Sequence, residues 1–248
     1  ETFHTFTADF KEEEFSEKLY VDETIKNIPK LKPHFIYPDP DKLKEKLEKI
    51  LYYQEFPFRS LAVFSQYEIY QHIAKYTQVK VLLNGQGSDE QFAGYSYHYF
   101  YALVDDLKLG NFKEFFTMFK FIKQIKNTST FYLFKTIIKL LLNKETLNKK
   151  LFSEFQITPL REYLRYEDRM SMMVSKETRL PFMDKDLIEY SFKLKNNYKI
   201  NSKQNKAILR SVVNYVDKKI INRKDKQGFV SPQENWQQEQ LKALMLEV

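Results

Sequence analysis

The sequence predicts an α/β protein in which a parallel sheet is flanked by helices and a helix-rich part follows. Over residues 1–95, short β-branched or aromatic runs alternate with amphipathic stretches, as a parallel sheet covered on both faces requires. Beyond residue 96 the strand signals almost vanish, and one helical pattern follows another. We therefore expect residues 1–95 to form an α/β part and residues 96–248 to form a mainly helical part that packs against it.

Strands and helices are expected to alternate in the first part. The runs "TFHTFTA" (2–8) and "HFIYP" (34–38) have the composition of strands, and the charged stretch 10–28 predicts a helix between them. The next helix should begin at Asp39, a favourable N-cap residue, with Pro40 at its first position. Its apolar positions share one face: Leu43, Leu47, Ile50 and Leu51.

A further helix and strand complete this part. After the loop 54–60, helical spacing places Ile69, Ile73 and Tyr76 in register, and the apolar run "VKVLLN" (79–84) predicts a strand. In the second part the helical patterns cover residues 111–125, 130–142, 157–174 and 185–194. The aromatic side chains that recur at helical spacing over 112–134 are expected in the core.

Composition narrows the class of protein. With 43% hydrophobic and 16% aromatic residues, a chain of 248 residues can bury a substantial core. The formal net charge of +7 invites a nucleic-acid hypothesis, but lysines pair with glutamates along helices, as Glu45 and Lys49 do. We expect solvated faces and no nucleic-acid partner. The absence of cysteine excludes disulfides and thiolate chemistry, and four histidines are a poor basis for a zinc site.

No targeting or membrane segment is predicted. The first ten residues lack the basic region and the apolar stretch of a signal peptide. The most apolar segment, 131–142, is 12 residues long and contains Lys135 and Lys139, whereas a spanning helix needs about 20 residues. We therefore expect a cytoplasmic protein with no membrane partner.

The stretch "VLLNGQGSDEQFAGY" (81–95) contains the clearest signal of a site. It combines a strand, a glycine-rich turn and the start of a helix, where backbone N–H groups can meet an anionic ligand. Asp89 and Glu90 would repel a phosphate unless a hard cation such as Mg²⁺ lay between them. The alternative is that these acids and Ser88 only cap the helix, and the spacing alone leaves both readings open.

Four segments in order resemble the synthetase domain of glutamine-hydrolysing asparagine synthetases, an ATP pyrophosphatase of the PP-loop type. Residues 81–95 are similar to the pattern V-x-L-S-G-E-G-A/S-D-E-L-F-G-G-Y. From Asp168 onward, residues 164–184 are similar to D-R-x-S-M-A-x-x-x-E-x-R-x-P-F-L-D. "NKAILR" (205–210) resembles K-x-x-L-R, and residues 222–236 resemble R-K-x-K-x-G-F-x-x-P…W. Together with "FPFRS" and "TFTAD", the likeness covers nearly the whole chain.

The resemblance implies an adenine nucleotide alpha hydrolase-like fold, in which residues 1–95 bind the nucleotide, and an enzyme that uses ATP and Mg²⁺. In this family ATP adenylates the side-chain carboxylate of aspartate with release of pyrophosphate, and ammonia displaces AMP to give asparagine. ATP would contact Ala8, Asn84, Gly85, Gly87 and Ser88. Asp89 would hold Mg²⁺, Gln86 and Lys206 would be catalytic, and Arg59 and Glu90 would bind the substrate.

Two features depart from the family pattern. The S-G-G-x-D-S pyrophosphate loop and the glutaminase domain are absent from these residues, and without cysteine no glutamyl thioester can form. We therefore expect the carboxyl-terminal part of a longer polypeptide, which receives ammonia from an upstream glutaminase domain and can form a homodimer. At Gln86 many members have Glu, which accepts a proton from ammonia, whereas an amide can only hydrogen-bond.

Three alternatives stay open beside an asparagine-forming ligase. The chain could belong to a relative that amidates or cyclises another carboxylate, such as β-lactam synthetase. It could be a scaffold module that has kept the fold and lost the chemistry. The third alternative, a nucleic-acid-binding protein, is supported only by the basic net charge. Glu177 and Arg179 are expected to form a buried scaffold pair rather than to react.

Overall fold

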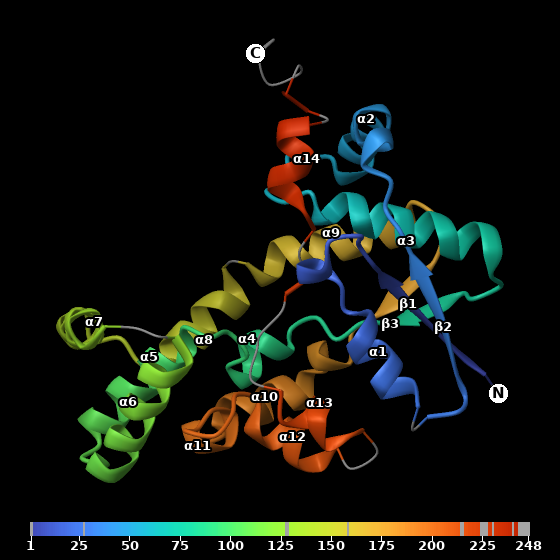
Figure 1. Ribbon diagram of the computed structural model, residues 1–248. Coiled ribbons are helices and arrows are strands. Elements are labelled where there is room, and N and C mark those ends of the chain that lie inside the picture. The colour runs from blue at the N-terminus through green and yellow to red at the C-terminus, as the bar shows by residue number, and fades with distance from the viewer. Residues whose placement is uncertain are drawn as a thin grey trace.

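The computed structural model describes residues 2–26, 28–126, 129–157, 159–213, 216–223, 228–229, 231–239 and 241–242. The described chain is a helix-rich α/β protein with small parallel sheets (Figure 1). Strand β1 (Phe3–Ala8) pairs with β2 (Leu31–Ile36), and β3 (Val81–Leu83) pairs with β4 (Glu177–Arg179). The prediction of parallel strands is confirmed. The expectation of one sheet is wrong for the described residues, because the strands form two separate pairs.

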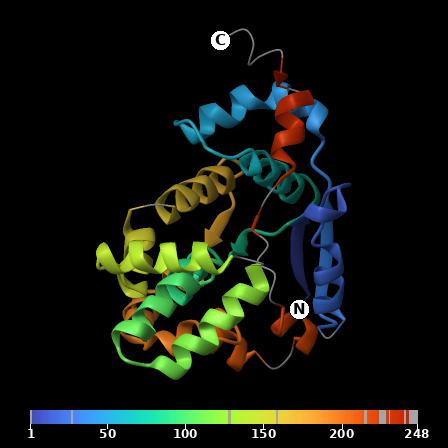
Figure 2. The same ribbon diagram turned by 60° about the vertical axis from the view of Figure 1, so that its left-hand side comes forward.

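The first helical region is shorter than predicted. The described residues of this stretch form a 3-10 turn at Glu13–Phe15 and then helix α1 (Lys18–Ile25). Ser16 interrupts the two, because its backbone is extended and its hydroxyl donates to the buried Asp9 carboxylate at 2.6 Å. That side chain competes with helical geometry, as serine often does. The β1–β2 pair and α1 lie together at one edge of the molecule (Figure 2).

Helices α2 (Leu43–Gln54) and α3 (Ala62–Tyr76) follow the second strand. Asp39 caps the 3-10 turn Pro40–Lys42 through Asp41 N–H, which confirms the predicted start. The predicted apolar faces are wrong at their carboxyl ends, since Leu51 is 40% and Tyr76 is 62% exposed. With α9 (Leu160–Met172) and α14 (Gln233–Glu239), these helices build the α3 cluster, whose buried members include Leu43, Ile50, Phe64, Ile73, Tyr166, Met170 and Trp236.

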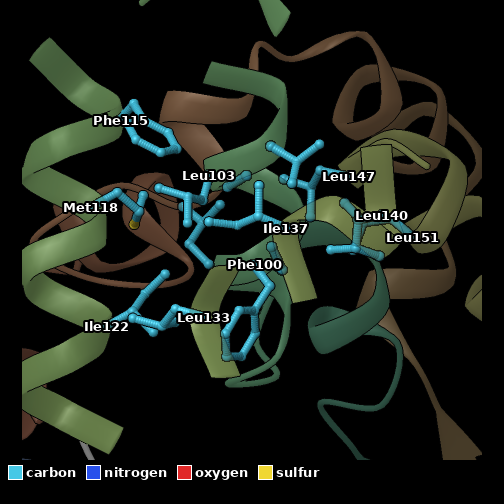
Figure 3. Close-up of a cluster of buried hydrophobic side chains, with 14 residues drawn as sticks. Phe100, Leu103, Phe115, Met118, Ile122, Leu133, Ile137, Leu140, Leu147 and Leu151 are labelled. Carbon is cyan, nitrogen blue, oxygen red and sulfur yellow. The ribbon is translucent and has the colours of Figure 1, made fainter. Parts of the chain in front are cut away.

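A second core forms around α5 (His98–Lys108), which α6 (Phe112–Lys126), α7 (Thr130–Leu142) and α8 (Leu147–Gln156) all contact. Figure 3 shows this α5 cluster, in which Phe115, Met118 and Ile122 of α6 point toward Leu103 and Leu133. The prediction that the aromatic stripe 112–134 is core is only partly right. The described side chains that are more than half exposed are Phe112, Phe116, Phe131, Tyr132 and Phe134.

The remaining segments pack below the loop that follows β3 (Figure 1). They are the 3-10 turn Pro181–Met183 and helices α10 (Lys185–Lys193), α11 (Asn196–Lys199), α12 (Ala207–Val212) and α13 (Lys218–Ile221). No helix within the described ranges is both long enough and apolar enough to cross a bilayer. Parts of the predicted 222–236 motif, namely residues 224–227 and 230, lie outside the described residues.

Strand β4 is the strand that the sequence did not predict, and helices α5 and α8 also lie outside the predicted helical segments. The three residues of the strand, Glu177, Thr178 and Arg179, have no apolar run, and the strand exists because it pairs with β3. Glu177 and Arg179 point away from the core and form an ion pair of 2.7 Å with side chains 57% and 63% exposed. The expectation of a buried scaffold pair is therefore wrong in its burial, although the two residues do pair.

Candidate functional site

The loop Asn84–Gly87 joins β3 to helix α4 (Ser88–Phe92), and it lies where the chain passes from one core to the other. Leu82 packs against the α3 cluster, and Ala93 belongs to the α5 cluster. The loop backbone is fixed at its start, where Asn84 N donates to Arg179 O at 3.0 Å. Two well-packed cores thus hold the ends of a short connection between them.

One hydrogen bond and one glycine shape the turn itself. Gln86 N donates to Asn84 Oδ1 at 3.1 Å. Gly87 has φ +94°, where other residues are strained, and a Cβ there would lie 3.0 Å from Met183 Sδ. Gly85 differs, because a Cβ there would meet no atom within 4 Å. The side of the turn next to Gly85 is open and leaves room for a ligand.

Lys206 reaches the start of α4 from a distant part of the chain. Its Nζ donates to Ser88 Oγ at 2.8 Å and lies 3.0 Å from Asp89 Oδ1. Both charged side chains are about one-fifth exposed, at 24% for Lys206 and 19% for Asp89. Three residues predicted as site residues are therefore in direct contact.

The backbone around Lys206 is held against α4. Lys206 has φ +48° and its N–H donates to Phe92 O at 3.2 Å. Asn205 Nδ2 donates to Gly94 O at 2.6 Å, and Arg210 donates to Asn205 at 2.9 Å through two of its nitrogens. A left-handed backbone at a non-glycine residue costs free energy and persists where the surroundings impose it. Sequence reasoning did not identify Asn205, although it directly precedes the predicted lysine.

Gly94, which follows helix α4, allows the Asp89 and Lys206 side chains to pack against its backbone. A Cβ at this position would lie 1.6 Å from Asp89 Oδ1 and 2.6 Å from Lys206 Cε. The Asp89 carboxylate therefore lies against the backbone of Gly94, and only a residue without a side chain leaves it that space. Gly94 was also missed as a site residue, because its role is visible only in the packing.

Glu90 is a buried acid next to this group. Its side chain is 1% exposed, Oε1 accepts from the Tyr95 hydroxyl at 2.6 Å, and Oε2 has no hydrogen-bond partner among the described residues. Burial raises the pKa of the Glu90 carboxyl, and the Tyr95 hydrogen bond opposes that rise. A buried carboxylate oxygen without a partner is costly in a folded protein and marks a position where a cationic ligand group can bind.

The other predicted residues lie farther from this contact. Arg59 is 77% exposed and pairs with Glu162 at 2.9 Å, while its N–H donates to the Tyr166 hydroxyl at 3.3 Å. Burial raises the pKa of Tyr163 on α9, and the Glu90 charge adds to that rise while the Arg59 charge opposes it. Ala8 ends β1 and belongs to the other strand pair.

The acids of the site suit one kind of metal binding. No group of three or more His, Asp or Glu side chains within the described ranges is arranged to hold an ion. Mg²⁺ commonly binds through one or two carboxylates together with substrate phosphates and water, so it does not need such a group. The single carboxylate of Asp89, close to an open glycine turn, fits that mode.

The fold and the site define a helix-rich α/β protein in which a strand, a glycine turn and a short helix bring an acid pair beside a lysine. The asparagine synthase family model matches residues 1–248, and the chain belongs to that family. It is 25% identical, over an alignment of 281 residues, to asparagine synthetase [glutamine-hydrolyzing] 1 of Bacillus subtilis (strain 168). The alignment covers 94% of this chain and 43% of the relative, so the chain spans less than half of the relative's length.

Proposed function

We propose that this chain is the ligase part of an ATP-dependent amide-forming enzyme with an adenine nucleotide alpha hydrolase-like fold. The aspartate side-chain carboxylate attacks the α-phosphorus of ATP, and pyrophosphate leaves. Ammonia then attacks the acyl carbon, AMP leaves, a proton is lost and asparagine forms. The observation that carries the proposal is the contact of Lys206 with Ser88 and Asp89, which lies beside an open glycine turn in a member of the asparagine synthase family.

Lys206 is the residue that meets the phosphates. Its ammonium donates to Ser88 and pairs with Asp89, and it can turn to a phosphate oxygen whose charge grows as pyrophosphate leaves. Asp89 would hold Mg²⁺, and the ion would supply positive charge to neutralise the phosphates. The nucleotide contacts the backbone or the small side chains of Ala8, Asn84, Gly85, Gly87 and Ser88.

Glu90 and Arg59 recognise the substrate. The Oε2 of Glu90, which has no hydrogen-bond partner among the described residues, is suited to an ammonium group. The exposed guanidinium of Arg59 is suited to a carboxylate. An amino acid such as aspartate has both groups. Arg59 must leave Glu162 to bind the substrate, which the exposure of its side chain permits.

Gln86 lies in the turn, beside the position where the acyl group is attacked. Its amide can orient ammonia through hydrogen bonds but cannot take the proton that ammonia loses. Water or another acid therefore accepts that proton. The remaining parts of the proposal concern the whole polypeptide, in which a glutaminase domain upstream supplies ammonia and two copies form a dimer in the cytoplasm. Residues 1–95 form the nucleotide-binding part and residues 96–248 the helical part.

Pyrophosphate exchange in the full polypeptide tests the proposal. With aspartate and Mg²⁺ present, radiolabelled pyrophosphate should enter ATP, because the adenylation step is reversible. A panel of other carboxylic acids, including β-amino acids and peptides, tests the first alternative, which is a related enzyme with another substrate. Exchange with one of those acids and not with aspartate would replace aspartate in the proposal.

A scaffold that lacks chemistry is the second alternative, and Gln86 favours it because an amide stands where a proton acceptor is common. Calorimetric titration of the 248-residue chain with Mg²⁺ and a non-hydrolysable ATP analogue distinguishes the two. Binding that is lost in Lys206→Met and kept in Lys150→Met supports the ligand site. A full polypeptide that binds no nucleotide and exchanges no pyrophosphate would leave the scaffold as the better description.

A further inference from the structure

A histidine and a glutamate form a buried pair at the start of α5. Both His98 of α5 and Glu154 of α8 are buried, and His98 Nε2 lies 2.8 Å from Glu154 Oε2. The Tyr97 hydroxyl donates to the other carboxylate oxygen, Oε1, which also pairs with Lys150 at 3.1 Å. Both oxygens of the carboxylate are thus engaged, and α8 holds the imidazole ring from one side.

The second ring nitrogen of His98 holds the backbone of Tyr95. Tyr95 N–H donates to His98 Nδ1 at 3.3 Å, and His98 N–H donates back to Tyr95 O at 3.0 Å. Because Nδ1 accepts from an N–H group, it has no proton of its own, and the ring proton is on Nε2. This Nε2–H donates to Glu154, and the two hydrogen bonds together select one tautomer of the ring.

Tyr95 connects this pair to the candidate site. Its hydroxyl donates to Glu90 Oε1 at 2.6 Å, while Oε2 of the same buried acid has no hydrogen-bond partner among the described residues. The Tyr95 ring also lies against His98 and stacks on Tyr97, at centroid distances of 5.3 and 5.4 Å. A backbone hydrogen bond and two ring contacts therefore determine where the tyrosine hydroxyl meets Glu90.

We propose that His98 is a positioning residue for the substrate-binding acid Glu90, and that it acts through Tyr95. Glu154 fixes the ring tautomer, Nδ1 fixes the tyrosine backbone, and the tyrosine hydroxyl holds Oε1 of Glu90 so that Oε2 is left for an ammonium group. Tyr95 ends the first segment that resembles the family pattern, whereas His98 and Glu154 lie outside all four segments. That Glu90 meets an ammonium group rests on the proposed function, whereas the coupling of His98 to Tyr95 does not.

The ring tautomer of His98 in the unmodified chain is the first test. NMR of the chain with isotope-labelled histidine, recorded near neutral pH, distinguishes protonated from unprotonated ring nitrogens. His98 should have its proton on Nε2 and none on Nδ1. A proton on Nδ1, or on both nitrogens, would overturn the proposal, because Nδ1 could then accept nothing from Tyr95.

Two substitutions separate the two nitrogens of the ring. In His98→Asn the side-chain oxygen takes the place of Nδ1 and can still accept from Tyr95, but the contact with Glu154 is lost. In His98→Gln the amide nitrogen can reach Glu154, but no acceptor lies at the position of Nδ1. Amide hydrogen exchange at Tyr95 should become at least about tenfold faster in His98→Gln and less than about threefold faster in His98→Asn. Equal rates in the two variants would overturn the proposal, because both remove the ring.

His34→Gln is the matched control. His34 also makes a ring-to-ring hydrogen bond, with His4 at 2.8 Å, but in the β1–β2 pair. Exchange at Tyr95 in this variant should stay within about twofold of the wild-type rate. An increase as large as that in His98→Gln would overturn the assignment to His98, because loss of any histidine would then have the same effect.

Glu154→Gln tests the same coupling from the other side of the ring, and it keeps the test valid if the His98 variants do not fold. The amide has one acceptor oxygen for the two donors that it meets, His98 and Tyr97. Part of the His98 population should therefore move its proton to Nδ1, and exchange at Tyr95 should become faster. An unchanged tautomer with unchanged exchange would overturn the proposal.

Substrate binding gives a readout that a merely structural role would not move. In pyrophosphate exchange by the full polypeptide, His98→Gln should raise the KM for aspartate by about tenfold and leave the KM for ATP within about twofold. Equal increases in both KM values would indicate a general loss of structure and would overturn the positioning role. If the wild type shows no exchange with any carboxylic acid, the proposed function fails, whereas the tautomer and the Tyr95 amide still decide the role of His98.

Discussion

The Lys206 ammonium lies 3.0 Å from Asp89 Oδ1, and this ion pair joins the helix after β3 to a segment more than a hundred residues later. Ser88 shares the same ammonium at 2.8 Å. The pair neutralises the acid that the proposal assigns to Mg²⁺. We therefore expect the lysine and the acid to exchange partners when phosphate and Mg²⁺ enter together.

Removal of the lysine charge tests that exchange. Lys206→Met should reduce the affinity for Mg²⁺ and a non-hydrolysable ATP analogue by about 10- to 100-fold, because a charge-assisted hydrogen bond contributes roughly 1.5–3 kcal/mol. Titration calorimetry measures the affinity. Lys150→Met is the matched control, since Lys150 also pairs with a buried acid, Glu154, at 3.1 Å but within helix α8. Equal affinities in the two variants would contradict the role of Lys206.

The same substitution, glycine to alanine, should lower the unfolding free energy at Gly94 and leave it nearly unchanged at Gly85. Gly94→Ala places a methyl group 1.6 Å from Asp89 Oδ1, so the carboxylate or the helix must move. Overpacking of this kind costs about 1–3 kcal/mol of unfolding free energy. Gly85→Ala meets no atom within 4 Å and should change it by less than about 0.5 kcal/mol. Urea unfolding compares them, and equal losses would show that the close contact at Gly94 is unimportant.

Lys199 is a buried cation that should destabilise the fold at neutral pH. It is fully buried, donates to Asn148 Oδ1 at 2.9 Å and lies 5.2 Å from the centre of the Phe192 ring. Burial lowers its pKa from 10.5 to about 8, which corresponds to about 3 kcal/mol. The unfolded chain keeps its proton up to the higher pKa. The unfolding free energy should therefore be lowest below pH 8 and rise as the pH goes from about 8 to about 10.5.

Substitution of this lysine provides the check. Lys199→Met should raise the unfolding free energy at pH 7 by about 1–3 kcal/mol and remove the rise at alkaline pH, since no titrating group remains there. Lys193→Met is the control, because Lys193 is 77% exposed and pairs only with Glu189 on its own helix. A loss of stability in Lys199→Met at pH 7 would show that its hydrogen bond outweighs the cost of the buried charge.

The helices were more predictable than the sheets because their signals are local. The segments predicted at 111–125, 130–142 and 185–194 match α6, α7 and α10 within one residue at each end. β4 could not be predicted, because Glu177, Thr178 and Arg179 have no strand-like composition and pair with residues far back in the sequence. The same limit explains why one sheet was expected where the described strands form two pairs.

The candidate site also has parts that the sequence indicates and parts that depend on contacts between distant residues. The glycine turn and its acids are adjacent in sequence, so the pattern of residues 81–95 indicates them directly. The approach of Lys206 to Asp89 follows from no local spacing, and only the resemblance of residues 205–210 to a family pattern suggested it. Gly94 has no such signal, because its closeness to Asp89 and Lys206 exists only in the packed structure.

The buried carboxylate of Glu90 should lower the unfolding free energy at neutral pH. The proposal assigns this carboxylate a contact with the ligand. Burial raises its pKa above the ordinary value of 4.5, so the folded chain binds a proton more tightly than the unfolded chain does. The unfolding free energy should therefore fall as the pH rises from about 4.5 through the folded pKa. Glu90→Gln cannot ionise, so urea unfolding should show a flatter pH profile and an equal or higher stability at pH 7.

Tyr95→Phe is the matched test of the same carboxylate. It removes the hydroxyl that donates to Glu90 at 2.6 Å and keeps the ring, so the ionised acid loses its hydrogen bond. The fall in stability with rising pH should become steeper than in the wild type, which is opposite to the effect of Glu90→Gln. Identical pH profiles in the wild type and both variants would show that Glu90 does not titrate differently in the folded chain. If Glu90 binds the ligand, the two variants should change the pH profile in opposite directions, and Glu90→Gln should also bind the substrate more weakly.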